Sequence, residues 1–468
     1  PRCLRCQQLG GSYLSRSRSC CGTTSTSGSG QPSMKTDTDI PALQFGIRAN
    51  LVLFAQLVLQ VFLVGLTIGM FRTVVPALAE SEFGVTKGSF MMLMAFVTAF
   101  GFVKGTLNFV AGRLSERIGR KRVLFLGWLA ALPIPLLILY APNWNWIVAA
   151  TVLLGINQGL TWSMTQTSKL DLTTAAQRGL TIGINEFAGY FGVAVAGVAT
   201  GYLAIAYGPR AGLMRFGFGV VGTATLLTWL GVKDTLQWAH AEGKKYAEPG
   251  GSGPRPRYPT NITDTPSTWD VFTLMSWRDA RMAALCQAGL VEKFVDALVW
   301  VLFPVYLYKH GLRLAGIGWV VGTYGFVWGV SQFATGYLSD LVGRRKPIIA
   351  GMWLCGAGVA LVLLGQGELW WSCAAALMGF GMALLYPTLS ASVSDIAHPS
   401  WRGSAIGIYR FWRDLGYGIG ALLLGAVAAL FGGIEAGFWF TAACMFISGG
   451  VVLVLCEETH PRLNPTRE

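Results

Sequence analysis

Long apolar runs constrain this chain more than any other feature of its sequence. Runs of roughly 20 residues recur from residue 52 to residue 456, and about 20 apolar residues in a helix cross the hydrocarbon core of a bilayer. The pattern therefore predicts twelve membrane-spanning helices. They are expected at residues 52–79, 89–112, 123–141, 146–168, 179–207, 212–232, 282–308, 315–338, 347–366, 369–394, 403–431 and 434–456.

The composition agrees with lipid as the solvent of this chain. Only 13% of the 468 residues are charged, against roughly 25% in soluble domains, and the mean hydropathy is +0.50. The net charge of +13 could suggest nucleic acid as a partner. A membrane protein that concentrates Lys and Arg in its cytoplasmic loops explains the charge better. We therefore expect the lipid bilayer as the partner, and no nucleic acid.

Basic residues are distributed unevenly among the short loops. The loops after the second, fourth, eighth and tenth spans share one side with the basic linker, and the remaining loops lie on the other. Because Lys and Arg favour the cytoplasmic side, both termini are expected in the cytoplasm. The short loops on the linker side carry eleven basic residues (Arg113, Arg117, Arg120, Lys121, Arg122, Lys169, Arg178, Arg344, Arg345, Lys346, Arg402). The loops on the other side carry five (Lys87, Arg210, Arg215, Lys309, Arg313).

The second half of the chain repeats the first at an offset of 224 residues. Gly112–Arg120 falls on Gly336–Arg344, and Arg178-Gly179 falls on Arg402-Gly403. An all-α membrane protein of two pseudo-symmetric six-helix bundles follows, and such duplication is typical of transporters. The expected domains are a disordered leader or tail (1–49), an N-terminal bundle (50–232), a cytoplasmic linker (233–281), a C-terminal bundle (282–457) and a cytoplasmic tail (458–468).

Residues 1–33 differ from the rest of the chain, because they are rich in Ser, Arg, Cys and Gly and contain no acid. Such a segment is either an organelle transit peptide or translated upstream sequence before a start at Met34. The first alternative would place the protein in an organelle membrane. The second leaves the inner membrane of the cell as the expected location.

The repeated loops resemble the signature loop of the major facilitator superfamily. The first copy reads Gly112-x-x-x-Glu116-Arg117-x-Gly119-Arg120-Lys121, and the second reads Gly336-x-x-x-Asp340-x-x-Gly343-Arg344-Arg345. The resemblance covers about residues 50–457 and implies a transporter that works by alternating access. It identifies no substrate.

The resemblance also implies how these loops control access. Gly112 and Gly336 would let two helices approach closely, and a carboxylate one turn later would meet the positive N-terminus of a helix in the other half. Such contacts exist only while the cytoplasmic side is closed, so they bias the inward/outward equilibrium. Gating is therefore assigned to Gly112, Glu116, Gly119, Arg120 with Asp171, and to Gly336, Asp340, Gly343, Arg344 with Asp395.

Charged residues within the spans are the candidates for the solute and proton pathway, because charges in a bilayer are costly. The offset pairs Arg72 with Asp296 and Glu186 with Arg410, so opposite charges could meet across a cavity; structural salt bridges are the alternative. Lys104, Lys293, Arg413 and Asp414 are also within spans. The proposed pathway comprises Arg72, Glu186, Glu292, Asp296, Arg410, Gln158, Trp162, Gln166 and Tyr386.

The chain has no pattern typical of a catalytic site, a metal site or a phosphate-binding loop, so we expect neither an enzyme nor a cofactor. The leading hypothesis is a monomeric, proton-coupled exporter of a small organic solute, an antiporter in which a carboxylate carries the proton. Uptake or uniport of an anionic metabolite is the first alternative, suggested by Arg72 and Arg410. A transporter-like sensor or assembly partner without transport is the second.

Overall fold

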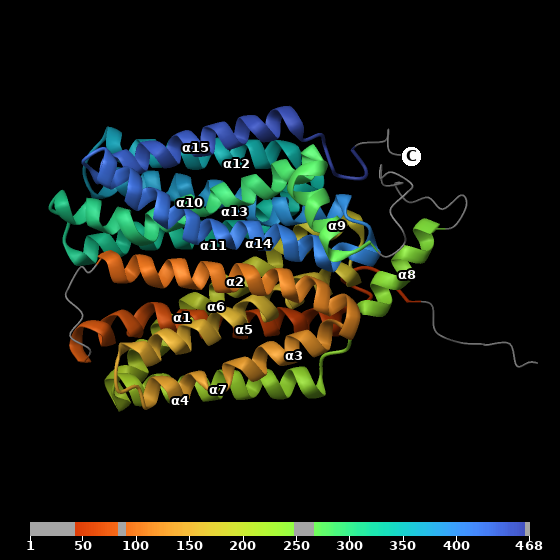
Figure 1. Cartoon of the computed structure of the whole chain (residues 1–468), viewed down its shortest axis with the longest axis horizontal. Coiled ribbons are helices and arrows are strands. Elements are labelled where there is room, and N and C mark those ends of the chain that lie inside the picture. Colours follow the sequence, from red (N-terminus) through yellow and green to blue (C-terminus); the bar gives the residue numbers. More distant parts are fainter. Residues whose placement is uncertain (1–42, 83–89, 248–265, 464–468) are drawn as a thin grey trace, which may run out of the picture. The chain divides into compact units, whose positions relative to one another are not determined.

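The computed structural model describes residues 43–82, 90–247 and 266–463, with the side chains of 43–71, 98–244, 266–313 and 316–463. These residues form an all-α structure without strands (Figure 1). The first half contains α1 (Leu51–Glu82), α2 (Phe90–Ile118), α3 (Arg120–Ala131), α4 (Ile134–Leu139), α5 (Trp144–Leu172), α6 (Arg178–Tyr207) and α7 (Pro209–Leu230).

The second half begins beyond two short helices of the linker, α8 (Leu236–Ala247) and α9 (Thr268–Thr273), and the turn η2 (Leu274–Arg278). The turns η1 (Ala175–Gln177) and η3 (Pro399–Trp401) precede α6 and α14. The long helices of this half are α10 (Ala280–Lys309), α11 (Leu314–Val342), α12 (Arg345–Leu364), α13 (Glu368–Ile396), α14 (Arg402–Leu430) and α15 (Ile434–Leu455).

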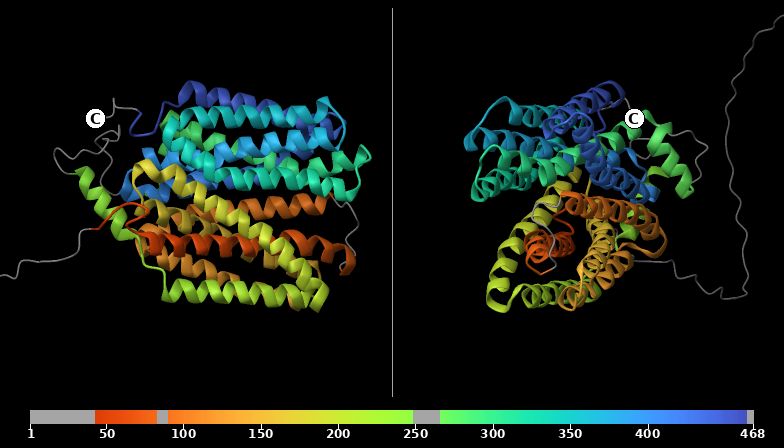
Figure 2. Two further views of the ribbon diagram at one scale, coloured as in Figure 1. Left: turned by 180° about the vertical axis from the view of Figure 1, so that it is seen from behind. Right: turned by 60° about the vertical axis from the view of Figure 1, so that its left-hand side comes forward.

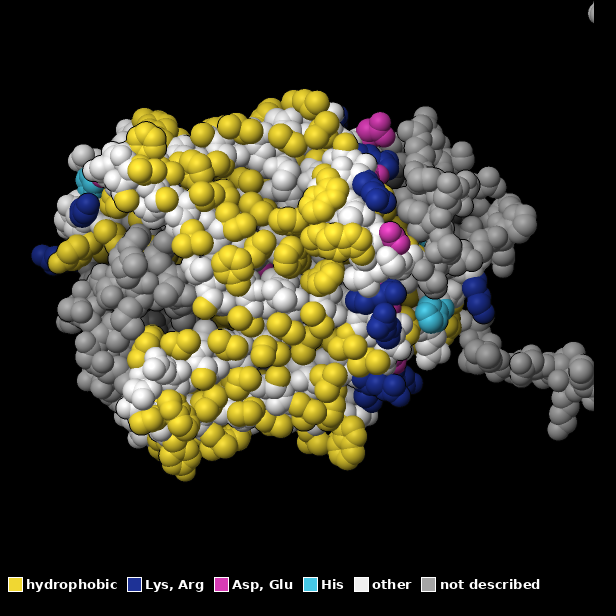
Figure 3. All heavy atoms as spheres, in the orientation of Figure 1, with side chains coloured by type: hydrophobic (Ala, Val, Ile, Leu, Met, Phe, Trp, Pro, Cys, Tyr) yellow, Lys and Arg dark blue, Asp and Glu magenta, His cyan; other side chains and the backbone are white. Residues whose placement is uncertain are grey.

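Within the described residues, nine helical segments are long and apolar enough to cross a membrane. The predicted span 123–141 is one of them, but it consists of α3 and α4, because Pro133 and Pro135 interrupt the helix. The helix α10 falls outside the nine, and it carries Glu292, Lys293 and Asp296 near its middle. A large apolar surface covers the flanks of the helices, as expected for lipid contact (Figure 3).

The buried apolar residues form two clusters. One contains residues between 53 and 232, and the other is built mainly from residues between 271 and 456. The helices of the two sets lie on opposite sides of a shared interface (Figures 1 and 2). In that interface α2 packs along α14, and α11 packs along α6.

Three segments predicted to be tail or linker are ordered in the structure. Residues 43–50 belong to the predicted leader or tail (1–49); in the structure Gly46 N donates to Leu172 O at 2.8 Å, and Trp238 Nε1 donates to Gln44 O at 3.1 Å. In the tail, Thr459 is buried. In the linker, Ser267 and Asp270 cap α9 reciprocally. Apolar length alone does not reveal these contacts, because they are made by short polar segments.

Candidate functional site

The second repeated loop binds the start of α6. Asp340 Oδ1 accepts a hydrogen bond from Gly179 N at 2.9 Å, and Oδ2 accepts from Leu180 N at 2.8 Å. The first N–H groups of a helix lack partners within it, and the helix dipole favours a negative charge there. Asp340 of the second half therefore caps a helix of the first half.

The first loop binds the start of α14 with a different pair of donors. Glu116 Oε1 accepts from Ser404 N at 2.6 Å, and Oε2 accepts from the Ser404 hydroxyl at 2.7 Å. Arg113 donates to the same carboxylate at 3.1 Å. The expected reciprocal arrangement is present, and the longer glutamate arm reaches one backbone donor and one side-chain donor.

The arginines of both loops make the expected ion pairs. Arg120 Nε lies 3.1 Å from Asp171 Oδ2, and Arg344 Nε lies 2.9 Å from Asp395 Oδ2. Arg344 Nη1 also lies 2.7 Å from Asp340 Oδ1, and these acids raise the pKa of Arg344 although burial opposes the rise. All of these side chains are buried. They lie at one end of the helix bundle, called the motif end below.

Four glycines in the loops have geometric roles. A Cβ on Gly112 would lie 2.5 Å from Gly403 O, and a Cβ on Gly336 would lie 2.4 Å from Gly179 O. Any side chain would therefore separate α2 from α14 or α11 from α6. Gly119 and Gly343 adopt φ angles of 95° and 93°, in the left-handed region that favours glycine.

In each loop, backbone N–H groups also donate to an acid that the sequence analysis missed. Asp234, which follows α7, accepts from Lys121 N at 3.1 Å. Glu458, which follows α15, accepts from Arg344 N at 2.8 Å and from Arg345 N at 3.1 Å. The two acids are one repeat apart (458 − 234 = 224), so extending the self-comparison beyond the spans could have found them.

A third residue that the sequence analysis missed, Glu242, joins both halves at the motif end. Glu242 of α8 accepts from Arg178 Nη2 at 3.0 Å and from Arg402 Nη1 at 2.7 Å. Arg178 begins α6 and Arg402 begins α14. Burial alone would raise the pKa of the Glu242 carboxyl, but the charges of Arg402 and Arg178 outweigh it and lower that pKa.

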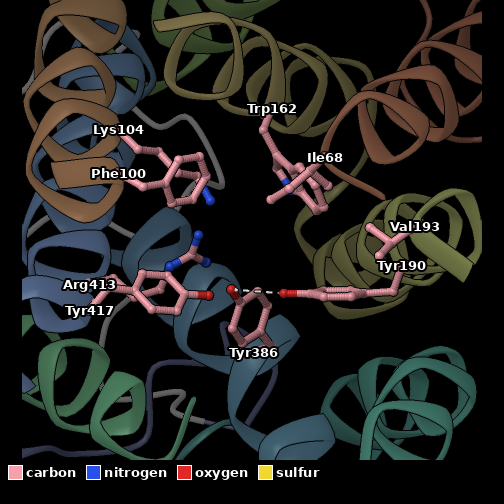
Figure 4. A pocket seen from close by; sticks show the side chains of 9 residues that line it. All are labelled: Ile68, Phe100, Lys104, Trp162, Tyr190, Val193, Tyr386, Arg413 and Tyr417. Carbon is pink, nitrogen blue, oxygen red and sulfur yellow. Dashed lines mark hydrogen bonds between the residues drawn. The ribbon is translucent and has the colours of Figure 1, made fainter. Parts of the chain in front are cut away.

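A cavity lies between the halves, at the middle of the helices. Figure 4 shows the nitrogen ends of Lys104 and Arg413 on one side of it, with Trp162 and Tyr190 on the other. Tyr190 OH and Tyr386 OH are hydrogen bonded at 3.3 Å. The lining residues are Ile68, Phe100, Lys104, Trp162, Tyr190, Val193, Tyr386, Arg413 and Tyr417.

A cluster of two acids and a lysine lies beside the cavity, on α10. Lys293 Nζ lies 2.7 Å from Asp296 Oδ2 and 3.7 Å from Glu292 Oε1, and all three side chains are fully buried. Asp296 also accepts from Tyr324 OH at 2.6 Å and from Tyr417 OH at 3.1 Å. Within the described part of the chain, neither oxygen of Glu292 has a hydrogen-bond partner.

The predicted pathway residues occupy different environments. Of the nine, Trp162 and Tyr386 line the cavity. Glu186 accepts from Trp162 Nε1 at 2.9 Å behind that wall. Gln158 donates to Val64 O at 3.0 Å, in the contact between α5 and α1.

The two charge pairs inferred from the repeat are not both visible. Arg410 donates to Gln166 and to Asn108, so its hydrogen bonds do not go to Glu186. The side chain of Arg72 lies outside the described residues, and its pairing with Asp296 stays a prediction. The predicted pathway omits Lys104 and Arg413, which line the cavity, because a charged residue within a span does not reveal which way its helix faces.

Sequence comparison matches the profile of the Major Facilitator Superfamily to residues 57–291 and 285–468. An uncharacterised MFS-type transporter of Salmonella typhimurium is 24% identical over 412 residues, which cover 85% of this chain and 95% of that protein. The multidrug resistance protein MdtH of Aeromonas hydrophila is 30% identical over 138 residues, which cover 28% of this chain and 35% of that protein.

Two solved structures share the fold. The human organic anion transporter TETRAN superimposes with a TM-score of 0.68 at 16% identity, covering 86% of this chain and 99% of that one. The fucose:proton symporter FucP of E. coli superimposes with a TM-score of 0.61 at 14% identity, covering 86% and 98%. At these identities the likeness concerns the fold alone.

Proposed function

Because the chain belongs to the Major Facilitator Superfamily, we propose that it exports a small organic solute in exchange for protons, by alternating access. Membership of this family makes it an integral membrane transporter rather than an enzyme. Proton exchange, the solute class and the direction are the parts that we propose, and so is a location in the inner membrane of the cell.

The proposed topology has twelve spans in two bundles, residues 50–232 and 282–457, with both termini in the cytoplasm. The two apolar clusters support the division, because each draws chiefly on one half. The motif end would then face the cytoplasm, which agrees with the Lys and Arg side chains that gather at that end of the molecule (Figure 3).

The contacts at the motif end support the proposed gating. Asp340 and Glu116 each join the halves through groups at a helix N-terminus. Opening the cytoplasmic side would have to break both, and the carboxylates and N–H groups released would be rehydrated. The balance between the two states therefore depends on these contacts.

The observation that carries proton coupling is the cluster of two buried acids that share one lysine. With all three groups ionised, Glu292, Lys293 and Asp296 would hold an uncompensated negative charge away from water. A proton on one acid removes that charge. We assign the proton to Glu292 in this state, because Asp296 has three close partners, whereas among the described residues the Glu292 carboxyl has only Lys293, at 3.7 Å.

Tyr417 connects this cluster with the cavity. Its ring lines the cavity, and its hydroxyl donates to Asp296 at 3.1 Å. A solute that displaces the ring would break this hydrogen bond and leave the Asp296 carboxylate with one donor fewer, so Asp296 would accept a proton more readily. The proton of Glu292 could then move to Asp296 while Lys293 turns to the Glu292 carboxylate, which would couple solute binding to proton transfer.

The test uses everted membrane vesicles with an imposed pH gradient and a pH-sensitive dye. Benzenesulfonate, benzyltrimethylammonium and benzamide serve as anionic, cationic and neutral probes. We expect Glu292→Gln to abolish gradient-driven accumulation but to retain solute exchange, while Glu368→Gln, at an exposed position, changes nothing. If Glu292→Gln and Asp296→Asn both accumulate solute like the parent chain, proton coupling through this cluster is wrong.

The direction of transport has a second candidate. Export draws its support from MdtH, a relative named for multidrug resistance that matches part of the chain. Uptake of an anionic metabolite is favoured by Lys104 and Arg413, which line the cavity. Repeating the flux assay in right-side-out vesicles separates the two, because only an uptake system then accumulates solute from the medium under the physiological gradient.

A further inference from the structure

We propose that the solute is an organic anion with a flat ring, which binds with its anionic group between Lys104 and Arg413. The ring would lie against Trp162, Tyr190 and Tyr386. This inference rests on the proposed transporter function, and it names the class of solute that the cavity recognises. Its basis is the placement of cations, acids and rings around the cavity.

The first argument is charge. Among the described residues, the two charged residues that line the cavity are both cations, and they share Asp414, which lies behind the lining. Asp414 Oδ2 lies 3.4 Å from Lys104 Nζ, and Oδ1 lies 3.1 Å from Arg413 Nε. Asn108 Nδ2 donates to the same carboxylate at 2.7 Å. The negative charge of Asp414 is therefore shared among three donors.

The second argument is an unused donor. Arg413 is 1% exposed, and within the described residues its Nη1 has no hydrogen-bond partner. Figure 4 shows this guanidinium in the space between Lys104 and the tyrosines. A buried donor without a partner is costly, and an anionic oxygen from the cavity would satisfy it with a charge-assisted hydrogen bond.

The other acids near the cavity do not supply this anion. The Asp296 carboxylate is bound to Lys293, Tyr324 and Tyr417. The Glu186 carboxylate lies behind the Trp162 ring, which donates to it. A solute that enters the cavity therefore meets the two cations before any carboxylate, which disfavours a cationic solute.

The third argument is the aromatic part of the lining, which begins beside the cations: Lys104 Nζ lies 5.5 Å from the Trp162 ring centroid, and Arg413 Cζ lies 4.5 Å from the Tyr386 ring centroid. The ring centroids of Trp162 and Tyr190 lie 5.8 Å apart in an edge arrangement, and those of Tyr190 and Tyr386 lie 6.1 Å apart. Rings at such separations leave faces and edges for a further ring to contact. The two cations and the three rings together fit an amphipathic anion. Its charge would lie toward α2 and α14, and its ring toward α5, α6 and α13.

The test measures binding to the purified full-length protein by isothermal titration, without a pH gradient. Benzenesulfonate, cyclohexanesulfonate and benzyltrimethylammonium are the probes. We expect the first to bind, the second to bind more weakly because it cannot stack, and the third not to bind. Equal binding of the cation, or no binding of either sulfonate, would overturn the proposal.

Variants then locate the site. Lys104→Gln and Arg413→Gln should each weaken benzenesulfonate binding at least about tenfold, because each removes a charged donor. Lys104→Arg and Arg413→Lys keep the charge and should retain most of the affinity, which separates lost binding from misfolding. Arg215→Gln, at an exposed position, is the control and should bind like the parent chain. If both Gln variants bind normally, the cations serve only helix packing and the proposal is wrong.

The result is distinguishable from failure of the proposed function. An anion that binds here but moves independently of the pH gradient would keep the solute class and remove proton coupling. A cation or a neutral compound that binds and moves with protons would do the reverse.

Discussion

The α2–α14 and α6–α11 interfaces occupy equivalent places in the repeat, yet only one of them is strongly charged. At the motif end they are alike, since glycine backbones meet in both and a carboxylate caps the facing helix. Half-way along the helices they diverge. At an offset of 224, Lys104, Asn108, Arg410, Arg413 and Asp414 of the first interface correspond to Trp328, Gln332, Glu186, Gly189 and Tyr190 of the second.

The difference separates two functions of the same helices. In the proposed transport cycle two backbones approach and part at the motif end in both halves, and this agrees with the small residues and caps that both copies share. At the middle of the helices the second interface has the tilted rings of Tyr190 and Trp328, with centroids 4.2 Å apart, where the first has the Lys104–Asp414 ion pair. A cavity between unlike walls can orient a solute that has two unlike ends.

The largest expected effect comes from removing the acid of the charged interface. Asp414→Asn leaves Lys104 and Arg413 buried without their shared anion, so we expect it to cost about 3–5 kcal/mol of stability. Its repeat counterpart is Tyr190, and Tyr190→Phe should cost less than about 1.5 kcal/mol because one neutral hydrogen bond is lost. Thermal unfolding of both variants in one detergent measures the difference.

Similar losses in the two variants would show that the interfaces are energetically alike, despite their different side chains. A double variant, Asp414→Asn with Lys104→Gln, sharpens the comparison. It should be more stable than Asp414→Asn alone, because it removes one of the stranded cations.

A smaller effect is expected at Glu242, which connects the starts of α6 and α14 and so belongs to both interfaces. Glu242→Gln weakens two charge-assisted contacts, so the motif end should open more often. Ser390→Cys is a suitable reporter in a chain without other cysteines, because Ser390 lies one turn from Tyr386 toward the motif end. We expect labelling by an impermeant maleimide to be roughly tenfold faster, and Lys244→Gln, at an exposed position, to leave it unchanged.

The pH dependence of this contact has a definite sign. Arg402 and Arg178 lower the pKa of Glu242 below its ordinary value of 4.5, despite burial. The contact is therefore complete above that value and is lost only as the pH falls through the lowered pKa. The labelling rate of Ser390→Cys, divided at each pH by the rate for a free thiol in solution because only the thiolate reacts, should stay constant from neutral pH down to the ordinary value. A rise between those limits would mean that another group controls the opening.

The contacts of the motif end could be predicted from the sequence because the residues that make them are close along the chain and recur at one offset. Asp340 lies four residues from Gly336, and the same spacing in the first copy identifies Glu116. The cavity could not be read in this way. Lys104, Tyr190 and Tyr417 line it because of how each helix is rotated, and that rotation depends on packing between helices distant in sequence. The position of a charged residue within a span indicates its depth in the membrane, but not which way its side chain faces.

The smallest effects are expected from two tyrosines of the cavity that differ in what their hydroxyls contact. Tyr417 OH donates to Asp296 at 3.1 Å, whereas Tyr386 OH is bonded to Tyr190 at 3.3 Å. Because a hydrogen bond to a charged group contributes about 1.5–3 kcal/mol and a neutral one about 0.5–1.5, Tyr417→Phe should change coupling more than Tyr386→Phe. The measurement is the number of protons moved per solute in reconstituted vesicles, together with the affinity for the solute. We expect Tyr417→Phe to lower the proton ratio while affinity changes only a few-fold, and Tyr386→Phe to leave the ratio intact. If both variants keep the parent ratio, the proton pathway does not run through Tyr417. The charged interface would then bind the solute without linking its binding to proton transfer.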